Sequence, residues 1–131
     1  MKRESWLRAA PESAPLARAI VRDAAAEYEL DGETTWDLML ATSELVTNAF
    51  EHGSHHPVRL TVRRAPDTAS ITVVSSGGDG RLPDVRDWTT ARADRISGRG
   101  LGIVREIADD IDVERDDHTV AITVHRRFAH V

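Results

Sequence analysis

The chain has 131 residues, of which 40% are hydrophobic and 30% are charged, so it can form one compact domain with its own core. Its 22 acidic and 17 basic side chains give a formal net charge of -5, which argues against general nucleic-acid binding. The absence of cysteine excludes disulfides and thiol chemistry, and we find no apolar run that resembles a signal peptide or a membrane span. We therefore expect a single cytoplasmic domain over residues 1–131.

Two helices are predicted in the first part of the chain. Residues 1–15 form an N-terminal arm, in which prolines interrupt any helix and a short edge strand is plausible. Apolar residues at helical spacing predict a first helix over residues 16–30. A second helix follows, which Thr34 or Thr35 can cap and which ends at Gly53.

Further along the chain, the apolar spacing changes from helical to alternating. Residues 58–62 and 71–73 alternate apolar and polar side chains, which predicts two strands joined as a hairpin. A polar stretch over residues 81–99 has no strong period and is long for a plain connection, so a mobile lid is plausible. A third helix over 103–108 and two strands within 111–124 complete the pattern. This order predicts an α+β two-layer sandwich, with helices packed on one face of a mixed, mainly antiparallel sheet.

One face of the second predicted helix carries polar side chains that core packing does not explain. Glu44, Asn48, Glu51 and His52 fall on the arc opposite the apolar residues. A solvated surface is the ordinary explanation of such an arc, but solvated faces usually mix in basic residues and this arc has none. Asn is also a mediocre helix former, so its place within the helix suggests a function for its side chain.

Two glycine-rich stretches bracket the predicted lid. Residues 75–80 read Ser-Ser-Gly-Gly-Asp-Gly, and residues 98–102 read Gly-Arg-Gly-Leu-Gly and run into the third helix. Glycines that open a helix leave backbone N–H groups free for an anion, so the second stretch could hold phosphates without a lysine. The alternative is a tight corner between loop and helix. A Walker-type loop is excluded because the chain has no Gly-Lys-Ser/Thr, and a dinucleotide-binding fold is disfavoured because no βαβ pattern surrounds the glycines.

Together these stretches resemble three sequence boxes of the GHKL ATPase/kinase superfamily, and within it the single-domain anti-sigma-factor serine/threonine kinases. Residues 44–53, Glu-Leu-Val-Thr-Asn-Ala-Phe-Glu-His-Gly, look like the N box of the family. Residues 76–80 stand where the first glycine box belongs, and residues 98–102 look like the second. The resemblance covers about residues 12–126. It implies a histidine-kinase-like ATP-binding domain of the Bergerat type, with an ATP lid over residues 81–99.

The resemblance also implies roles for residues of the N box. Glu44 would act as the general base that orients or deprotonates the acceptor hydroxyl. Asn48, one helical turn later on the same face, would coordinate a Mg2+ ion that bridges the phosphates of ATP. His52 would help to close the nucleotide site, although an interaction with the carboxyl-terminal dipole of the helix would explain it equally well.

The glycine boxes supply the remaining implied contacts with ATP. These are Gly78 and Gly80 beside the adenine and the hinge of the lid, Arg99 against a phosphate or pointing to solvent, and the backbone amides of Gly100, Leu101 and Gly102 on the phosphates. One position departs from the family pattern, because Ser76 stands where an Asp normally accepts a hydrogen bond from the adenine. Loss of a charge-assisted hydrogen bond would cost about 1–2 kcal/mol, unless Asp79 substitutes for it.

The implied function is that of an ATP-dependent serine/threonine protein kinase acting as an anti-sigma regulatory factor. It would phosphorylate an STAS-type anti-anti-sigma protein, bind a sigma factor in exclusive alternation, and form a possible homodimer. The substitution at Ser76 keeps an alternative open, namely a non-catalytic or weakly nucleotide-binding module that sequesters a transcription regulator. Neither function requires direct contact with nucleic acid or membrane.

Overall fold

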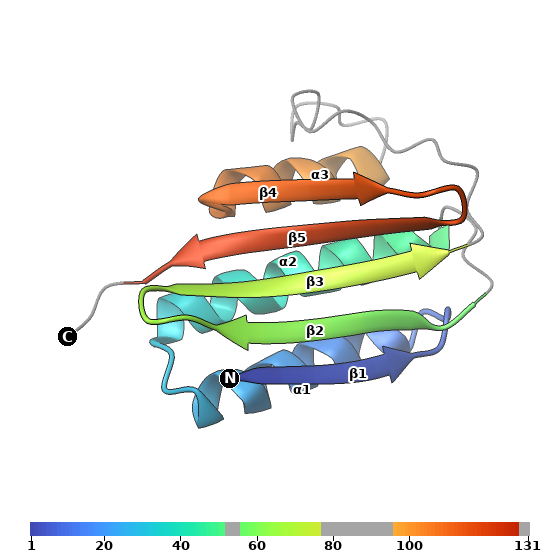
Figure 1. Cartoon of the computed structure of the whole chain (residues 1–131). Helices are drawn as coiled ribbons and strands as arrows, with labels where there is room; N and C mark the ends of the chain where they lie inside the picture. The colour runs from blue at the N-terminus through green and yellow to red at the C-terminus, as the bar shows by residue number, and fades with distance from the viewer. Residues whose placement is uncertain (52–55, 77–95, 129–131) are drawn as a thin grey trace.

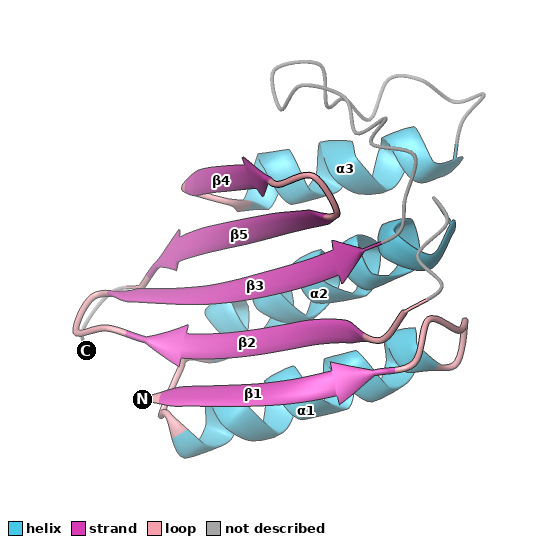
Figure 2. Cartoon of the chain, turned by 45° about the vertical axis from the view of Figure 1, so that its right-hand side comes forward, coloured by secondary structure: helices cyan, strands magenta, loops and turns pink. Residues whose placement is uncertain are grey.

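The computed structural model describes residues 1–51, 56–76 and 96–128, which form five strands and three helices (Figures 1 and 2). In chain order these elements are β1 (Lys2–Leu7), α1 (Ser13–Glu27), α2 (Gly32–Glu51), β2 (Val58–Arg64), β3 (Thr68–Ser76), α3 (Ile96–Ile107), β4 (Asp110–Arg115) and β5 (Thr119–Arg127). None of the helices in these residues is long and apolar enough to cross a membrane.

The strands form one sheet in the order β1-β2-β3-β5-β4, and all three helices lie on the same face of it (Figure 1). This confirms the predicted α+β two-layer sandwich. Every pair of neighbouring strands in the described sheet is antiparallel, so the mixed sheet of the prediction is antiparallel in these residues. The edge strand expected in the arm is present as β1, which pairs with β2 along its whole length.

The core lies between the sheet and the helices. The alternation predicted for the hairpin places every second residue of β2 and β3 in this core, as with Leu60 and Ile71, which are both fully buried. Helix α2 contributes Leu38 and Leu45 from its apolar side. Helix α1 faces the core largely with alanines and Val21, and these small side chains let it lie close to α2.

The predicted starts of all three helices were wrong. Helix α1 begins at Ser13, inside the predicted arm, because proline is tolerated in a first helical turn. Helix α2 begins at Gly32 and is capped by Asp31, whose Oδ2 accepts a hydrogen bond from the Thr34 amide at 3.1 Å. The side-chain and backbone hydrogen bonds with Thr34 lower the pKa of Asp31. Helix α3 begins at Ile96, inside the stretch expected to be lid.

One partly exposed ion-pair cluster joins the sheet to the beginning of α2. The Arg126 side chain on β5 donates from Nε to Oδ2 of Asp37 at 3.0 Å. Its other nitrogens lie 3.5 Å from a carboxylate oxygen of Glu33 and 3.8 Å from one of Asp109, which follows α3. Arg126 therefore connects three segments that are distant in sequence, at the opposite end of α2 from the polar residues of the N box.

Candidate functional site

The polar face of α2 lies beside both other helices, because α2 packs between α1 and α3 (Figure 2). Glu44 is half-buried on this face, and its carboxylate meets the backbone of α3 at Gly100. A Cβ atom at Gly100 would lie 2.3 Å from Glu44 Oε2 and 3.2 Å from its Cδ. Only a glycine leaves room for the carboxylate in its present position, so this glycine brings the two helices together at Glu44.

The surroundings of Glu44 favour its protonated form. Burial is the largest cause and raises the pKa of Glu44, and the nearby Glu51 carboxylate raises this pKa further. The Arg18 guanidinium on α1 acts in the opposite direction and lowers it in part. Arg18 is held at this point by Ser43, whose Oγ accepts a hydrogen bond from Arg18 Nη1 at 2.7 Å. A carboxylate with a raised pKa accepts a proton more readily than an ordinary one, as a general base requires.

Arg18 and Ser43 did not emerge from the sequence as site residues. Arg18 is on α1 and lies 25 positions before Ser43, which is on α2, and only the packing of the two helices brings these side chains together. Glu51 was part of the polar arc, and its influence on Glu44 follows from a separation of seven residues, which is about two helical turns.

Asn48 is the most unusual polar residue of the site. Its side chain is only 8% exposed, yet among the described residues its buried Oδ1 has no hydrogen-bond partner. Buried polar atoms are normally satisfied, and leaving one unpaired costs about 1–3 kcal/mol. An amide oxygen is a hard ligand of the kind that Mg2+ prefers, so this orphaned acceptor fits the magnesium site that the resemblance implies.

Thr42 provides a useful contrast on the same helix. Its Oγ1 is also buried without a partner, but Thr42 is 0% exposed and lies one helical turn from both Leu38 and Val46, which are core residues. It therefore faces the apolar interior. The unpaired oxygen of Asn48 belongs instead to the polar face of α2 that carries Glu44.

The second glycine box lies within α3 rather than at its start. Gly100 and Gly102 are buried, and the Leu101 side chain belongs to the core. Because α3 begins at Ile96, the amide groups that a helix leaves free are those of its first four residues. The expectation that the glycines open the helix was therefore wrong. For the amides of residues 100–102 to hold phosphates, the first turn of α3 would have to unwind.

The end of β3 contains Ser76, the position that departs from the family pattern, and the sheet register shows which way it faces. Ser75 pairs with Val120 and Ser76 pairs with Thr119 across the sheet. Val120 packs against the core, so the alternation of the strand turns Ser75 toward the helices and Ser76 toward the open face. Ser75 is therefore better placed than Ser76 to meet a ligand on the helix side.

Several predicted site residues lie outside the described part of the chain. These are His52, Gly78 and Gly80, together with residues 81–95 of the predicted lid and the side chain of Arg99. The described residues bring Glu44 against the Gly100 backbone, and Asn48 lies one helical turn from Glu44 on the same helix.

Comparison with known proteins identifies the family of the chain. Residues 7–125 match the family model of the histidine kinase-like ATPase domain. The sensor histidine kinases MtrB of Mycobacterium leprae and Mycobacterium tuberculosis are 35% and 33% identical to the chain over 72 residues. Each alignment covers 50% of this chain but only 13% of the relative, so the chain spans a small part of these kinases.

Two solved structures share the fold. The RsbU and RsbW domains of Rv1364c from Mycobacterium tuberculosis align with a TM-score of 0.72 and 20% identity, over 97% of this chain and 32% of that one. A chain of the SiaB–SiaC complex from Pseudomonas aeruginosa aligns with a TM-score of 0.63 and 10% identity, over 96% of this chain and 89% of that one. At these identities the likeness concerns the fold alone. The family match covers nearly the whole chain, and the resemblance to the GHKL superfamily is confirmed; the chain belongs to the histidine kinase-like ATPase domain family.

Proposed function

We propose that this protein is a Mg2+- and ATP-dependent serine/threonine protein kinase of the anti-sigma type. The observation that supports this most directly is the buried, unpaired Oδ1 of Asn48, one helical turn from Glu44. The half-buried Glu44 carboxylate with its raised pKa adds a candidate general base on the same face, which nucleotide binding alone would not require.

In this proposal the two residues of α2 have separate tasks. Asn48 holds the Mg2+ ion, which when bound neutralises charge on the phosphates during transfer. Glu44 accepts the proton from the attacking hydroxyl of the acceptor protein as that oxygen bonds to the γ-phosphorus and the bond to ADP breaks. Gly100 gives the Glu44 carboxylate the room it needs beside α3.

The acceptor in this proposal is an STAS-type anti-anti-sigma protein, and the competing partner is a sigma factor. The support comes from the resemblance to the anti-sigma kinases and from the shared fold with an RsbW domain. It also comes from the shared fold with a chain of the SiaB–SiaC complex, which is an assembly of two proteins.

Calorimetric titration with Mg·ATP tests the metal and nucleotide part of the proposal. We expect wild-type protein to bind and Asn48→Ala to lose the part of the affinity that depends on Mg2+. Thr42→Val is the matched control, because it removes the other unpaired oxygen of α2 but faces the core, and it should bind like wild type. Equal Mg2+-dependent binding by Asn48→Ala would remove Asn48 from the site.

A second function is favoured by the serines at the end of β3. Where the family has a carboxylate, both Ser75 and Ser76 are uncharged, which would weaken the hold on adenine. The protein would then be a kinase-like module that sequesters its partner without phosphorylating it. Incubation of candidate STAS-type proteins with labelled ATP separates the two, because a labelled acceptor that is lost with Glu44→Gln supports only the kinase.

A further inference from the structure

Apolar side chains follow one another along the outer side of α2, which faces away from the sheet. Trp36 is 64% exposed, and Leu40 follows it one helical turn later on the same side. This side is opposite to the one that carries Leu38 and Leu45 into the core. Leu40 is half-buried and lies outside the hydrophobic core of the described residues, so core packing accounts for neither side chain.

Helix α3 adds a third apolar side chain beside these two. The contact of Glu44 with Gly100, and the ion pairs of Arg126 with the start of α2 and the residue after α3, show that the two helices are antiparallel (Figure 2). Ile103 therefore lies one turn from Gly100 in the direction of Leu40. Ile103 is also half-buried and outside the core of the described residues. The name outer ridge is used below for these three side chains, Trp36, Leu40 and Ile103.

The outer ridge leads to the candidate general base. Eight residues at about 1.5 Å each put Trp36 roughly 12 Å from Glu44 along the axis of α2, with Leu40 midway between them. A single exposed apolar side chain needs no explanation, whereas a contiguous apolar surface beside a reactive group is typical of a site that binds a partner. The partner that must approach Glu44 is the one that carries the acceptor hydroxyl.

The side of the ridge next to α1 is basic. Arg18 reaches Ser43, and Arg22 stands one helical turn later on the same side of α1. Because α1 and α2 are joined by a short connection and run antiparallel, Arg22 is level with the outer ridge. Its side chain is exposed and lies 3.5 Å from the carboxylate of its neighbour Asp23, an arrangement that contributes little by itself. An acidic side chain of a partner would therefore complement this flank.

We propose that the outer ridge is the docking surface for the acceptor protein, which packs an apolar side chain against Trp36 and Leu40 while its hydroxyl reaches Glu44. This role rests on the proposed function, because it takes Glu44 as the base that receives the hydroxyl proton. The apolar residue of the acceptor lies roughly 12 Å from the hydroxyl, which is about four residues in an extended segment or eight in a helix. An acidic side chain of the acceptor lies at Arg22.

Binding to a chain that lacks the base tests the ridge without catalysis. Each STAS-type protein encoded in the same genome is titrated by calorimetry into Glu44→Gln protein with Mg·ATP present. In this background Trp36→Ala and Leu40→Ser should each raise the Kd for the acceptor at least ten-fold, because a large aromatic side chain at the centre of an interface carries much of its affinity. Arg22→Glu should raise Kd by about three-fold at low salt and by less at high salt, since a charge at the rim is screened.

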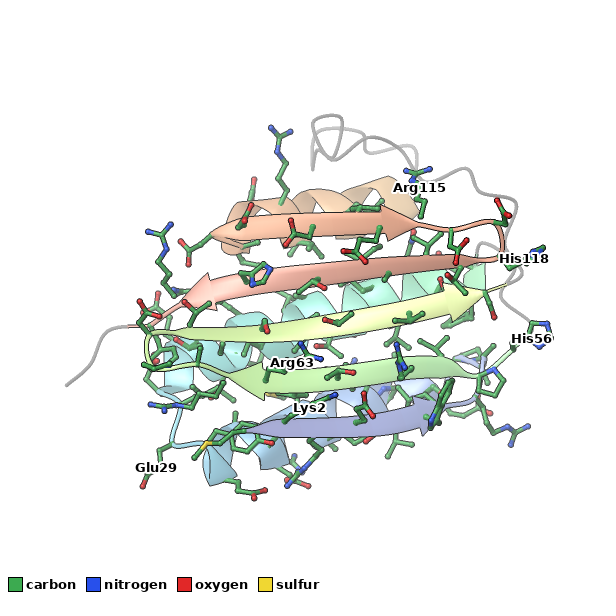
Figure 3. All side chains as sticks on the ribbon, in the orientation of Figure 1. Lys2, Glu29, His56, Arg63, Arg115 and His118 are labelled. Carbon is green, nitrogen blue, oxygen red and sulfur yellow. The ribbon has the colours of Figure 1, made fainter. Side chains whose placement is uncertain are left out.

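Trp6→Ala is the matched control for Trp36→Ala. Trp6 is 68% exposed on β1, and strand alternation puts it on the face of the sheet that carries Lys2 and Arg63 and that lies away from the helices (Figure 3). Its removal should leave the Kd for the acceptor unchanged. With Glu44 present, Trp36→Ala should raise the KM for the acceptor about ten-fold and change kcat by less than about two-fold, because the ridge lies apart from the reacting atoms.

The outcomes separate the docking surface from the kinase. A Trp36→Ala protein that binds the acceptor as tightly as its parent overturns the docking surface and leaves the kinase proposal intact. Acceptor binding that depends on Trp36, without phosphoryl transfer when Glu44 is present, overturns the kinase and supports the docking surface. The docking surface also fails if Trp6→Ala weakens binding equally, or if no STAS-type protein binds the wild-type chain. Should Leu40→Ser fail to fold by circular dichroism, Trp36→Ala at its exposed position decides the question.

Discussion

Replacement of Gly100 by alanine should separate the stability of this protein from its proposed chemistry. The new Cβ would lie 2.3 Å from Glu44 Oε2, whereas ordinary contacts begin at about 3.4 Å, so the carboxylate must move by about 1 Å or more. The atom in the way is the end of a flexible side chain, and a new rotamer costs about 0.5–1.5 kcal/mol. Alanine in place of glycine within a helix returns about 1 kcal/mol. The free energy of unfolding should therefore change by less than about 1 kcal/mol.

The effect on Glu44 should be much larger. A shift of about 1 Å in a catalytic group can cost about 100-fold in rate, so phosphoryl transfer should fall by that factor. Displacement toward water should also bring the pKa of Glu44 back toward its ordinary value of 4.5, which a carboxyl titration by NMR measures without any acceptor protein.

Gly32→Ala is the control for the Gly100 substitution. Gly32 begins α2, and a Cβ there would meet nothing within 4 Å, so the pKa of Glu44 and the transfer rate should stay unchanged. A Gly100→Ala protein with the wild-type pKa of Glu44 would refute the contact on which the reasoning rests. A loss of more than about 3 kcal/mol in stability would show that the carboxylate cannot move aside.

Three further substitutions have definite expected outcomes in chemical unfolding. Glu44→Gln should stabilise the fold at pH 7 by up to about 1 kcal/mol after allowance for solvent screening. Because folding raises the pKa of Glu44, the contribution of this carboxyl to wild-type stability is greatest below pH 4.5 and is lost as the folded carboxyl ionises. A gain from the substitution that persists in acid would contradict this. Thr42→Val should stabilise by about 1 kcal/mol at all pH values, because it removes an unpaired buried hydroxyl, and a loss would mean that the hydroxyl has a partner. Arg126→Met should destabilise the fold by about 2 kcal/mol, because it leaves the Asp37 carboxylate without its hydrogen bond. Arg22→Met is the control at an exposed arginine and should change the stability by less than about 0.5 kcal/mol.

The fold was largely predictable because its elements follow simple periodicities. Alternation in β2 and β3 and helical spacing in α2 depend on local sequence, and the same alternation determines which face is buried. The predicted helix boundaries were wrong where two local sequence rules favour different ends. Asp31, rather than the predicted Thr34 or Thr35, caps the second helix, and Ile96 begins a helix inside a stretch that has no clear period.

The site was predictable only within single segments. Glu44 and Asn48 lie one turn apart on one helix, so their spacing alone indicates a shared face. The contact of Glu44 with Gly100 and the approach of Arg18 depend on how three helices pack, which no local pattern encodes. The choice between Ser75 and Ser76 also required the sheet register, since a shift of one residue exchanges the two faces.

The position of β5 has a consequence for how the chain folds. This strand comes last in chain order among the described elements, yet it lies inside the sheet and pairs with β3 from Thr68 opposite Arg127 to Ser76 opposite Thr119. The β1–β2–β3 part can pair early, but within the described sheet β4 pairs only with β5. Such long-range pairing slows folding, because the entropy cost of closing a large loop comes before the contacts between β3 and β5 can offset it. During synthesis the edge of β3 that pairs with β5 therefore stays uncovered until β5 has left the ribosome, and an uncovered strand edge favours aggregation.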